Sequence, residues 1–396
     1  MIFAYLLLYA CILVYGASKL GIGVQEATVV FAKHDWLHHL TFWLYNRYPS
    51  ELVVRLPVIL VTLFNIVLFW FVAKNYLKKP KDALLATLIF SLLPAVLGSG
   101  VVVSKAPFIL FFILSFLLLY QKGLDLPLAF ALLFLDKAFA VLFVAVALYE
   151  IYAKKYKKAI VYGLFFALSL WLYGFEVGGR PKNYFLDTFA ILSAIFSPLV
   201  FLYYFYSLYR VGLKEPKDII WFVSATAFLF ALILSFRQRI HIVDFAPFAV
   251  VGVVVMVRVF LRSFRVRLPK YRKKFQIAFW IVILSLVLND LALMFNGFLF
   301  DFLPPKSHFA YRYYLAKNLA KKLQDLKISC ADIKERSLAR QLRFYHIGTC
   351  ATPVLSLRPL SNAIEWKIPL AGGKSLSVYV TYGNKIPRFR AFASPL

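Results

Sequence analysis

Long apolar runs separated by short basic segments occupy the chain up to about residue 298, and a mainly polar segment follows. A helix needs about 17 to 25 apolar residues to cross the hydrocarbon core of a bilayer. The candidate spans are 2–22, 52–73, 83–100, 104–121, 160–174, 185–209, 218–236, 242–263 and 276–298. The stretch 126–152 is too long for one span, and Asp136 and Lys137 interrupt it. It therefore predicts two further short helices joined by a turn.

The pattern predicts an all-α polytopic membrane bundle of about eleven transmembrane helices over 1–298. The segment 299–396 is expected to form a small α/β domain outside the membrane. Apolar spacing within this domain predicts helices over 311–326 and 335–345 and strand-like segments over 328–333 and 375–381.

Lysine and arginine are concentrated in alternate short loops, namely 74–82, 121–126, 152–159, 210–217 and 264–275. Short cytoplasmic loops carry such an excess of basic residues. The N-terminus is therefore expected in the cytoplasm, and the C-terminal domain on the extracytoplasmic side. The first apolar run lacks a charged start and a small-residue cleavage site, so we interpret it as a retained helix rather than a signal peptide.

The composition is typical of a membrane protein, because 62% of the residues are hydrophobic and the mean hydropathy is +0.75. The formal net charge is +28. Because the cytoplasmic loops carry much of this excess next to anionic headgroups, membrane lipids are the expected partners, and no nucleic-acid partner is implied. The outward domain contains no N-x-S/T site, which favours a bacterial inner membrane.

Most of the remaining charges fall on the predicted outer face. They are Glu26, Lys33, Asp35, Arg47, Glu51, Lys105, Asp136, Lys137, Glu176, Arg180, Lys182, Arg237, Arg239 and Asp244. Charges held at membrane depth usually line a cavity or a pathway. A cavity rimmed by cations would suit a lipid phosphate, because cations stabilise the phosphate as it leaves and a carboxylate removes a proton from an attacking hydroxyl. The implied chemistry is sugar transfer from a lipid phosphate.

A family resemblance appears at the residues that close the first outer loop. The segment 50–57, S-E-L-V-V-R-L-P, resembles the S-E-x-x-x-R-L-P stretch of GT-C class glycosyltransferases, which include the protein O-mannosyltransferases and the transferases that put aminoarabinose on lipid A. Segments 74–86, 131–139 and 237–247 resemble later family motifs in the same order. The resemblance covers roughly residues 1–298.

The resemblance implies transfer of a sugar from a polyprenyl-phosphate donor to a glycan, lipid or protein acceptor, with inversion at the sugar carbon and no cofactor. The predicted catalytic base is Glu26 or, as its substitute, Asp35. The predicted phosphate-binding residues are Lys137, Arg237, Arg239, Lys105 and Arg55, and Arg55 would alternatively order the first loop.

Some positions depart from the family pattern. The acidic pair after the first helix reads Gln25-Glu26, a second acidic position reads Ser104-Lys105, and Asp136 replaces the usual threonine of the turn. The alternative prediction is therefore a catalytically inactive relative, or a transporter or scaffold for a lipid-linked saccharide.

Two further features carry weaker predictions. His34, Asp35, His38 and His39 could seat a metal, but the neighbouring aromatic residues describe an amphipathic interfacial helix equally well, so no metal is expected. Cys330 and Cys350 both lie in the outward domain, where an oxidising environment would permit a disulfide between them.

Overall fold

A computed structural model describes residues 2–33, 35–174, 183–359, 363–370 and 373–382. The chain divides into two compact units. The first, called here the bundle unit, comprises Met1–Leu13 and Pro57–Leu293, and the second, the mixed unit, comprises Val14–Leu56 and Met294–Leu396. The sequence predicted one boundary near residue 298, whereas the structure joins the first outer loop to the C-terminal segment.

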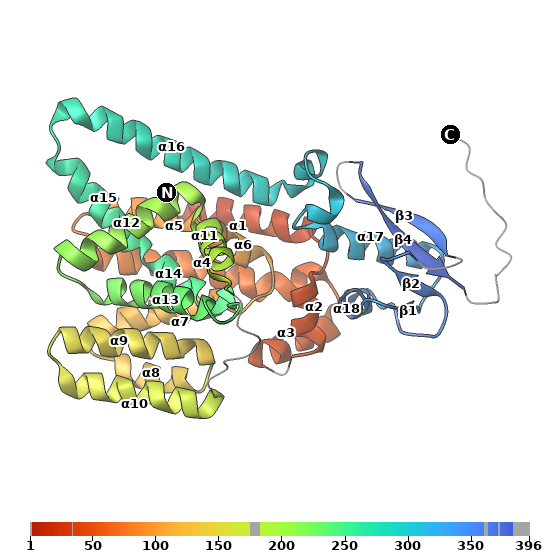
Figure 1. The fold of residues 1–396 in the computed structure, drawn as a ribbon, viewed down its shortest axis with the longest axis horizontal. Helices are drawn as coiled ribbons and strands as arrows, with labels where there is room; N and C mark the ends of the chain where they lie inside the picture. Colours follow the sequence, from red (N-terminus) through yellow and green to blue (C-terminus); the bar gives the residue numbers. More distant parts are fainter. Residues whose placement is uncertain (1, 34, 175–182, 360–362, 371–372, 383–396) are drawn as a thin grey trace. The chain divides into compact units, whose positions relative to one another are not determined.

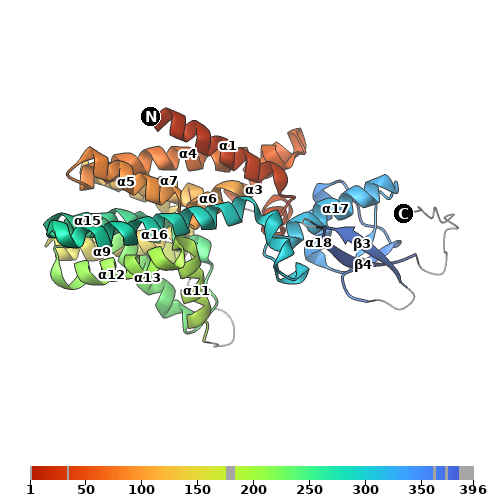
Figure 2. The ribbon, with the colours of Figure 1, turned by 90° about the horizontal axis from the view of Figure 1, so that it is seen from above.

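The bundle unit consists of helices that follow one another with short connections (Figures 1 and 2). Two of its helices, α1 (Ile2–Lys19) and α4 (Glu51–Tyr76), also contribute to the mixed unit. The others are α5 (Pro80–Ser91), α6 (Pro94–Val101), α7 (Ala106–Gln121), α8 (Asp125–Leu133), η1 (Lys137–Phe139), α9 (Ala140–Tyr152), α10 (Tyr156–Tyr173), α11 (Phe185–Phe196), α12 (Pro198–Lys214), α13 (Ile219–Ser235), η2 (Ile242–Asp244), α14 (Ala246–Val251), α15 (Val253–Val266) and α16 (Pro269–Met294). The prediction of a bundle of apolar helices is therefore confirmed.

Three helical segments are long and apolar enough to cross a membrane: Glu51–Tyr76, Ala246–Val266 and Pro269–Met294. Three bent pairs of helices pass the same test together, and α7 and α13 are shorter apolar helices. These lengths and compositions make the chain a multi-pass membrane protein. The predicted total of about eleven crossings stays a prediction.

Prolines break two of the predicted spans. The span predicted at 185–209 is a pair of helices, α11 and α12, that meet at an angle of 103°. Ser197 between them has a φ of +71°, and Pro198 begins the second helix because it cannot donate the backbone hydrogen bond that a continuous helix requires. Pro94 similarly divides the span predicted at 83–100 into α5 and α6. The two helices and the turn predicted for 126–152 are confirmed as α8, η1 and α9.

The mixed unit combines short helices with a four-stranded sheet. Its remaining elements are α2 (Val24–Phe31), α3 (Trp36–Arg47), η3 (Asn296–Asp301), η4 (Pro305–Ser307), α17 (Tyr311–Asp325), β1 (Asp332–Ile333), α18 (Arg336–Phe344), β2 (Val354–Ser356), β3 (Ile364–Pro369) and β4 (Ser375–Thr381). The strand order is β1-β2-β4-β3, with β1 and β2 parallel and the other pairs antiparallel. The predicted small α/β domain is therefore confirmed, and strands β2 and β3 are additions to the prediction.

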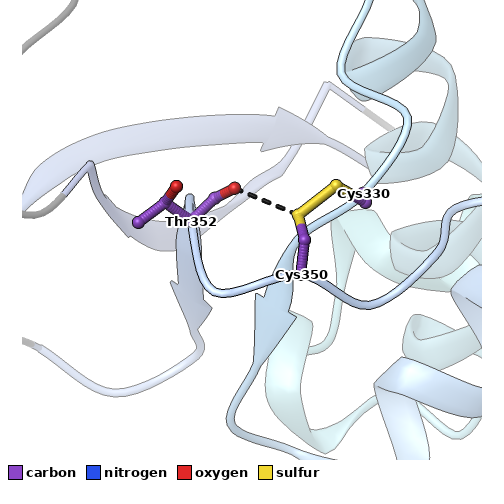
Figure 3. Close-up of a disulfide and its surroundings, with 3 residues drawn as sticks. All are labelled: Cys330, Cys350 and Thr352. Carbon is purple, nitrogen blue, oxygen red and sulfur yellow. Dashed lines mark hydrogen bonds between the residues drawn. A yellow bond between two sulfur atoms is a disulfide. The ribbon is translucent and has the colours of Figure 1, made fainter.

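Alternating side chains explain how the sheet and α17 form one core. Leu376, Val378 and Val380 of β4 are buried on the same face, because successive residues of a strand point to opposite sides. They share a cluster with Leu315 and Leu319 of α17. A disulfide between Cys330 and Cys350 joins the segments that precede β1 and β2 (Figure 3).

Candidate functional site

Two of the predicted phosphate-binding residues line one cavity in the bundle unit. Lys137 begins η1, directly after the turn that ends α8, and Arg239 lies in the extended segment between α13 and η2. The cavity has a volume of about 180 Å³. The structure thus brings together a lysine and an arginine that are about 100 positions apart in the sequence.

The same cavity has one polar end and apolar walls. Its polar lining includes Gln238, His241 and Asp244 besides the two cations. The apolar lining comes from three helices: Val141 and Val144 of α9, Phe166 and Leu170 of α10, and Phe230 and Leu234 of α13. Cations beside apolar helices are the chemical requirement for a phosphate with a hydrocarbon tail.

Lys105, the third predicted phosphate ligand, is held by two carboxylates. Its ammonium nitrogen lies 3.1 Å from Asp136 Oδ2 and 2.7 Å from Asp244 Oδ1. Asp136 also accepts a hydrogen bond from the backbone N–H of Ala138, which fixes the start of η1. Lys105 therefore joins three segments of the chain: the residue before α7, the turn before η1, and η2. Lys105 thus contacts Asp244, which lines the cavity, and its phosphate-binding role stays a prediction.

His241 and Gln238 were not predicted as site residues, although both line the cavity with Arg239. The four consecutive residues 238–241 all line the cavity, so no alternation in the sequence marked them. Arg237, which is exposed like Arg239, is not among the described residues that line the cavity.

In the mixed unit, Glu26 and Arg55 form a buried ion pair. Arg55 Nη2 lies 2.6 Å from Glu26 Oε2, and Arg55 Nε donates to Glu26 Oε1 at 2.9 Å. Glu26 Oε2 also accepts the backbone N–H of Gly23 at 2.7 Å. Both carboxylate oxygens therefore accept hydrogen bonds. The catalytic role predicted for Glu26 stays a prediction, and the structure gives this residue a definite structural contact.

The loop between α1 and α2 approaches α17 very closely. A Cβ atom added at Gly21 would lie 2.4 Å from the backbone oxygen of Tyr313, and one added at Gly23 would lie 2.7 Å from the Tyr313 ring. Burial, with the nearby Glu26 carboxylate as the second cause, raises the pKa of Tyr313 to about 12. A larger residue would displace the Tyr313 backbone at the first position and the Tyr313 ring at the second.

Glu51, at the start of α4, is held by two residues of the C-terminal segment. Lys317 Nζ lies 2.7 Å from Glu51 Oε2, and the hydroxyl of Tyr345 donates to Glu51 Oε1. The same hydroxyl accepts the backbone N–H of Ile22 at 2.9 Å. Burial and, after it, the Glu51 carboxylate raise the pKa of Tyr345 well above its ordinary value. The segment 50–57, which carries the family resemblance, thus contributes two side chains that form hydrogen bonds within the mixed unit: Glu51 accepts them and Arg55 donates them.

Asp35, the other predicted base, caps α3. Its Oδ1 accepts the backbone N–H of His38 at 3.0 Å, and the carboxylate is half-buried. His38 Nδ1 lies 3.0 Å from the backbone oxygen of Val29, so this imidazole is engaged by the chain itself. Among the described residues, no group of three His, Cys, Asp or Glu side chains is arranged to hold a metal.

Several charges singled out in the sequence, namely His34, Glu176, Arg180 and Lys182, lie outside the described residues. The described site residues fall into two groups. Lys105, Lys137 and Arg239 belong to the bundle unit, where Lys137 and Arg239 share the cavity, while Glu26, Asp35 and Arg55 belong to the mixed unit.

The fold and these polar groups define a multi-pass membrane protein with a helical bundle and a small α/β domain. The chain is similar to the crystal structure of ArnT from Cupriavidus metallidurans in the apo state, with a TM-score of 0.57 and 11% sequence identity over 95% of this chain and 97% of that chain. At this identity the likeness establishes the fold. The shared fold confirms, as a likeness of fold, the family resemblance that the sequence motifs predicted. No family model matches the chain, and no curated protein sequence matches it either.

Proposed function

We propose that this protein is an integral-membrane glycosyltransferase that takes a sugar from a polyprenyl-phosphate donor on the extracytoplasmic side of the membrane. One observation carries the proposal: Lys137 and Arg239 line a single cavity whose other walls are apolar side chains of α9, α10 and α13. A donor of this class has the same two parts, an anionic phosphate and a hydrocarbon tail. The GT-C-like fold supports the assignment to this class.

The charge balance of the cavity favours an anion. Among the described residues that line it, Lys137 and Arg239 contribute two positive charges, and Asp244 contributes one negative charge that is already paired with Lys105. When the bond between the sugar carbon and the phosphate oxygen breaks, negative charge accumulates on the departing lipid phosphate. Lys137 and Arg239 would stabilise that charge by direct contact with the phosphate oxygens.

The acceptor hydroxyl needs a base, because its oxygen forms the new bond to the sugar carbon as its proton leaves. Both predicted bases remain in the proposal. Glu26 accepts hydrogen bonds from Arg55 and Gly23 with both oxygens, whereas Asp35 is half-buried and caps α3 with Oδ1. This difference favours Asp35 as the proton acceptor and Glu26 as the residue that keeps the first loop in place. Attack from the face opposite the phosphate would invert the sugar carbon.

The proposed location is a bacterial inner membrane, with the mixed unit on the outer side. The disulfide between Cys330 and Cys350 supports this orientation, because disulfides persist in oxidising compartments such as the periplasm. The proposed acceptor is a glycan, a lipid or a protein. No metal and no organic cofactor is part of the proposal.

A second candidate function is binding or transport of a lipid-linked saccharide without catalysis. The observation that favours it is the buried ion pair of Glu26 and Arg55. Glu26 is the one acidic residue at the position where the family carries an acidic pair, and Arg55 already binds its carboxylate. The neighbouring residue of that position is Gln25. A non-catalytic protein would keep the donor cavity and would not need a base.

Donor binding is tested with purified protein in detergent, using undecaprenyl phosphate and the uncharged alcohol undecaprenol as probes. The wild type should bind the phosphate, and Lys137→Gln and Arg239→Gln should each weaken that binding by roughly tenfold or more, since hydrogen bonds between charged groups are worth about 1.5–3 kcal/mol. Arg237→Gln is the matched control, because Arg237 is exposed outside the cavity lining. Equal binding of phosphate and alcohol by the wild type would sink the proposal.

Transfer is tested separately, with the wild type, Asp35→Asn and Glu26→Gln reconstituted in vesicles that contain lipid-linked sugars extracted from bacterial membranes. Release of undecaprenyl phosphate by the wild type, but not by folded Asp35→Asn, supports the transferase with Asp35 as base. Donor binding without any release by the wild type supports the non-catalytic alternative.

A further inference from the structure

A second cavity in the bundle unit is apolar throughout and has a volume of about 400 Å³. Four helices line it, with Ile89 from α5, Tyr203 from α12, Phe260 from α15 and Phe275 and Phe279 from α16 among its residues. None of these residues lines the cavity with Lys137 and Arg239. Its volume falls within the range of about 300–1,000 Å³ that is typical of ligand pockets.

One wall of this cavity is formed by a helix that the rest of the chain covers poorly. Only 6% of the most apolar part of α16 is buried within the structure, compared with 67% for the segment Ala246–Val266. Figure 1 shows α16 along one edge of the bundle unit. Lipid therefore has direct access to the groove between α16 and its neighbours.

All four helices carry their basic residues at the same end. The lining residues Leu199 to Tyr206 precede Arg210 and Lys214 on α12, and on α15 the lining ends at Phe260, before Arg262, Arg265 and Arg267. On α16 the first residue that lines the cavity, Phe275, directly follows a run of basic residues. A second run of basic residues lies at the start of α5. These two runs are Lys270, Arg272, Lys273 and Lys274, and Lys78, Lys79 and Lys81. This is the end that the sequence predicts to be cytoplasmic.

Carboxylates neutralise only part of this basic end. The segment 258–274 has eight Lys and Arg residues and no Asp or Glu. Asp218 pairs with Arg258, Glu215 with both Arg210 and Arg262, and Asp82 with Arg265. Of the eight cations in 258–274, all of them described, five have no carboxylate within 4 Å among the described residues: Arg267, Lys270, Arg272, Lys273 and Lys274. An anion from outside the chain would complete the charge balance.

Two arginines connect the basic end to the cavity itself. The guanidinium carbon of Arg267 lies 3.5 Å from the centre of the Phe275 ring, which lines the cavity. Arg210 lies on α12 one helical turn after Tyr206, another lining residue. Arg210 also donates to Ser263 Oγ at 2.8 Å, which holds α12 beside α15. A phosphate between these arginines would lie at the mouth of the apolar cavity.

We propose that this cavity binds an anionic phospholipid, with one acyl chain between α12, α15 and α16 and the phosphate at Arg210 and Arg267. Basic pockets between transmembrane helices on the cytoplasmic side hold anionic headgroups in this way. The site differs from the proposed donor cavity in its helices, in its lining and in the predicted side of the membrane. The assignment is therefore independent of the proposed glycosyltransferase activity.

Native mass spectrometry of the purified full-length protein tests the site, with phosphatidylglycerol and phosphatidylcholine of identical palmitoyl and oleoyl chains as probes. The wild type should retain the anionic lipid in preference to the zwitterionic one. Arg210→Gln with Arg267→Gln should weaken retention of phosphatidylglycerol roughly tenfold, because each basic residue near a headgroup contributes measurably to binding. Ala278→Trp, which fills the cavity from the exposed face of α16, should reduce retention of both lipids.

The control is Lys155→Gln with Lys157→Gln, which removes two exposed charges at the start of α10, outside the cavity lining. It should leave the preference unchanged, and Arg267→Lys, which keeps the charge, should retain most of it. Equal retention of the two lipids by the wild type would overturn the proposal. So would an equal loss in the control, or a stronger retention of undecaprenyl phosphate than of phosphatidylglycerol at this cavity.

Discussion

Arg55 uses all five of its N–H donors on buried acceptors, and two of these acceptors are the carboxylate oxygens of Glu26. Nε and Nη2 donate to Glu26, Nη2 also donates to the backbone oxygen of Gly21, and Nη1 donates to the backbone oxygens of Ala17 and Leu20. The side chain is completely buried. The pair therefore fixes the end of α1 and the loop that follows it.

This pair predicts a large effect on stability. Arg55→Met leaves the Glu26 carboxylate buried without its counter-ion, which should reduce the free energy of unfolding by about 3–5 kcal/mol. Glu26→Gln should cost less, because the amide oxygen still accepts hydrogen bonds from Arg55. Thermal unfolding in detergent measures both effects, and Arg47→Gln, a change at an exposed arginine, is the control. An Arg55→Met protein that melts together with this control would contradict the structural role.

Lys105 should behave as a positioning residue of the donor cavity. Lys105→Met leaves Asp136 and Asp244 without the cation between them, so we expect a loss of stability of about 2 kcal/mol or more and weaker donor binding. Lys105→Arg should restore most of both. Hydrogen exchange of the segments 136–139 and 242–245 reports the local effect. If Lys105→Met weakens undecaprenyl phosphate binding with unchanged exchange in these segments, then Lys105 contacts the phosphate directly.

His308 predicts a dependence of stability on pH. The imidazole is buried against Phe300, its Nδ1 accepts the backbone N–H of Ala310 at 3.0 Å, and Nε2 lies 3.0 Å from the backbone oxygen of Asn296. Protonation of Nδ1 would break the first of these bonds. Burial lowers the pKa of His308 below its ordinary value of 6.5, although the Asn296 contact acts in the opposite direction.

The sign follows from proton binding. Below about pH 6.5 the unfolded chain protonates at this histidine and the folded chain does not, so the stability contribution is complete above that pH and is lost as the pH falls toward the folded pKa. His308→Asn should flatten this part of the stability profile, measured as the melting temperature between about pH 7.5 and 5.5. The exposed His39 provides the control, His39→Gln. An unchanged slope in His308→Asn would show that another group is responsible.

The disulfide predicts a redox-dependent stability of the mixed unit. Cys330 and Cys350 are 20 residues apart, so reduction or Cys330→Ser with Cys350→Ser should cost about 2–4 kcal/mol by releasing a loop of this length in the unfolded chain. The loss of stability is measured by comparing the unfolding of the wild type and of the double variant with and without dithiothreitol. The double variant should be insensitive to reductant. A wild type that is equally insensitive would mean that the bridge is absent.

Several parts of the fold were predictable because they depend on local patterns. The alternation in Ser375–Thr381 matched β4 over its whole length, and the helical spacing after Tyr311 matched α17 closely. The interruption at Asp136 and Lys137 correctly indicated a turn between two short helices. Strands β2 and β3 were not predicted, because buried and exposed residues do not alternate regularly along them.

The candidate site was predictable only in part. Lys137 and Arg239, which the family resemblance pointed to, line one cavity, and their phosphate-binding role stays a prediction. His241 and Asp244 were not assigned to that site, since no sequence rule decides which side of an extended segment faces a cavity. Arg55 and Lys105 were expected at a phosphate, whereas carboxylates far away in the sequence engage both of them.

The sequence by itself determined that this chain is a membrane protein built mainly of apolar helices, and that its C-terminal segment includes a small α/β fold. Hydropathy and periodicity are properties of neighbouring residues, so they can be read without coordinates. Only the tertiary structure decided which charges neutralise each other and which side chains line a common cavity. Ion pairing depends on distances of a few ångströms between residues such as Glu26 and Arg55, and the chain's path through space sets those distances.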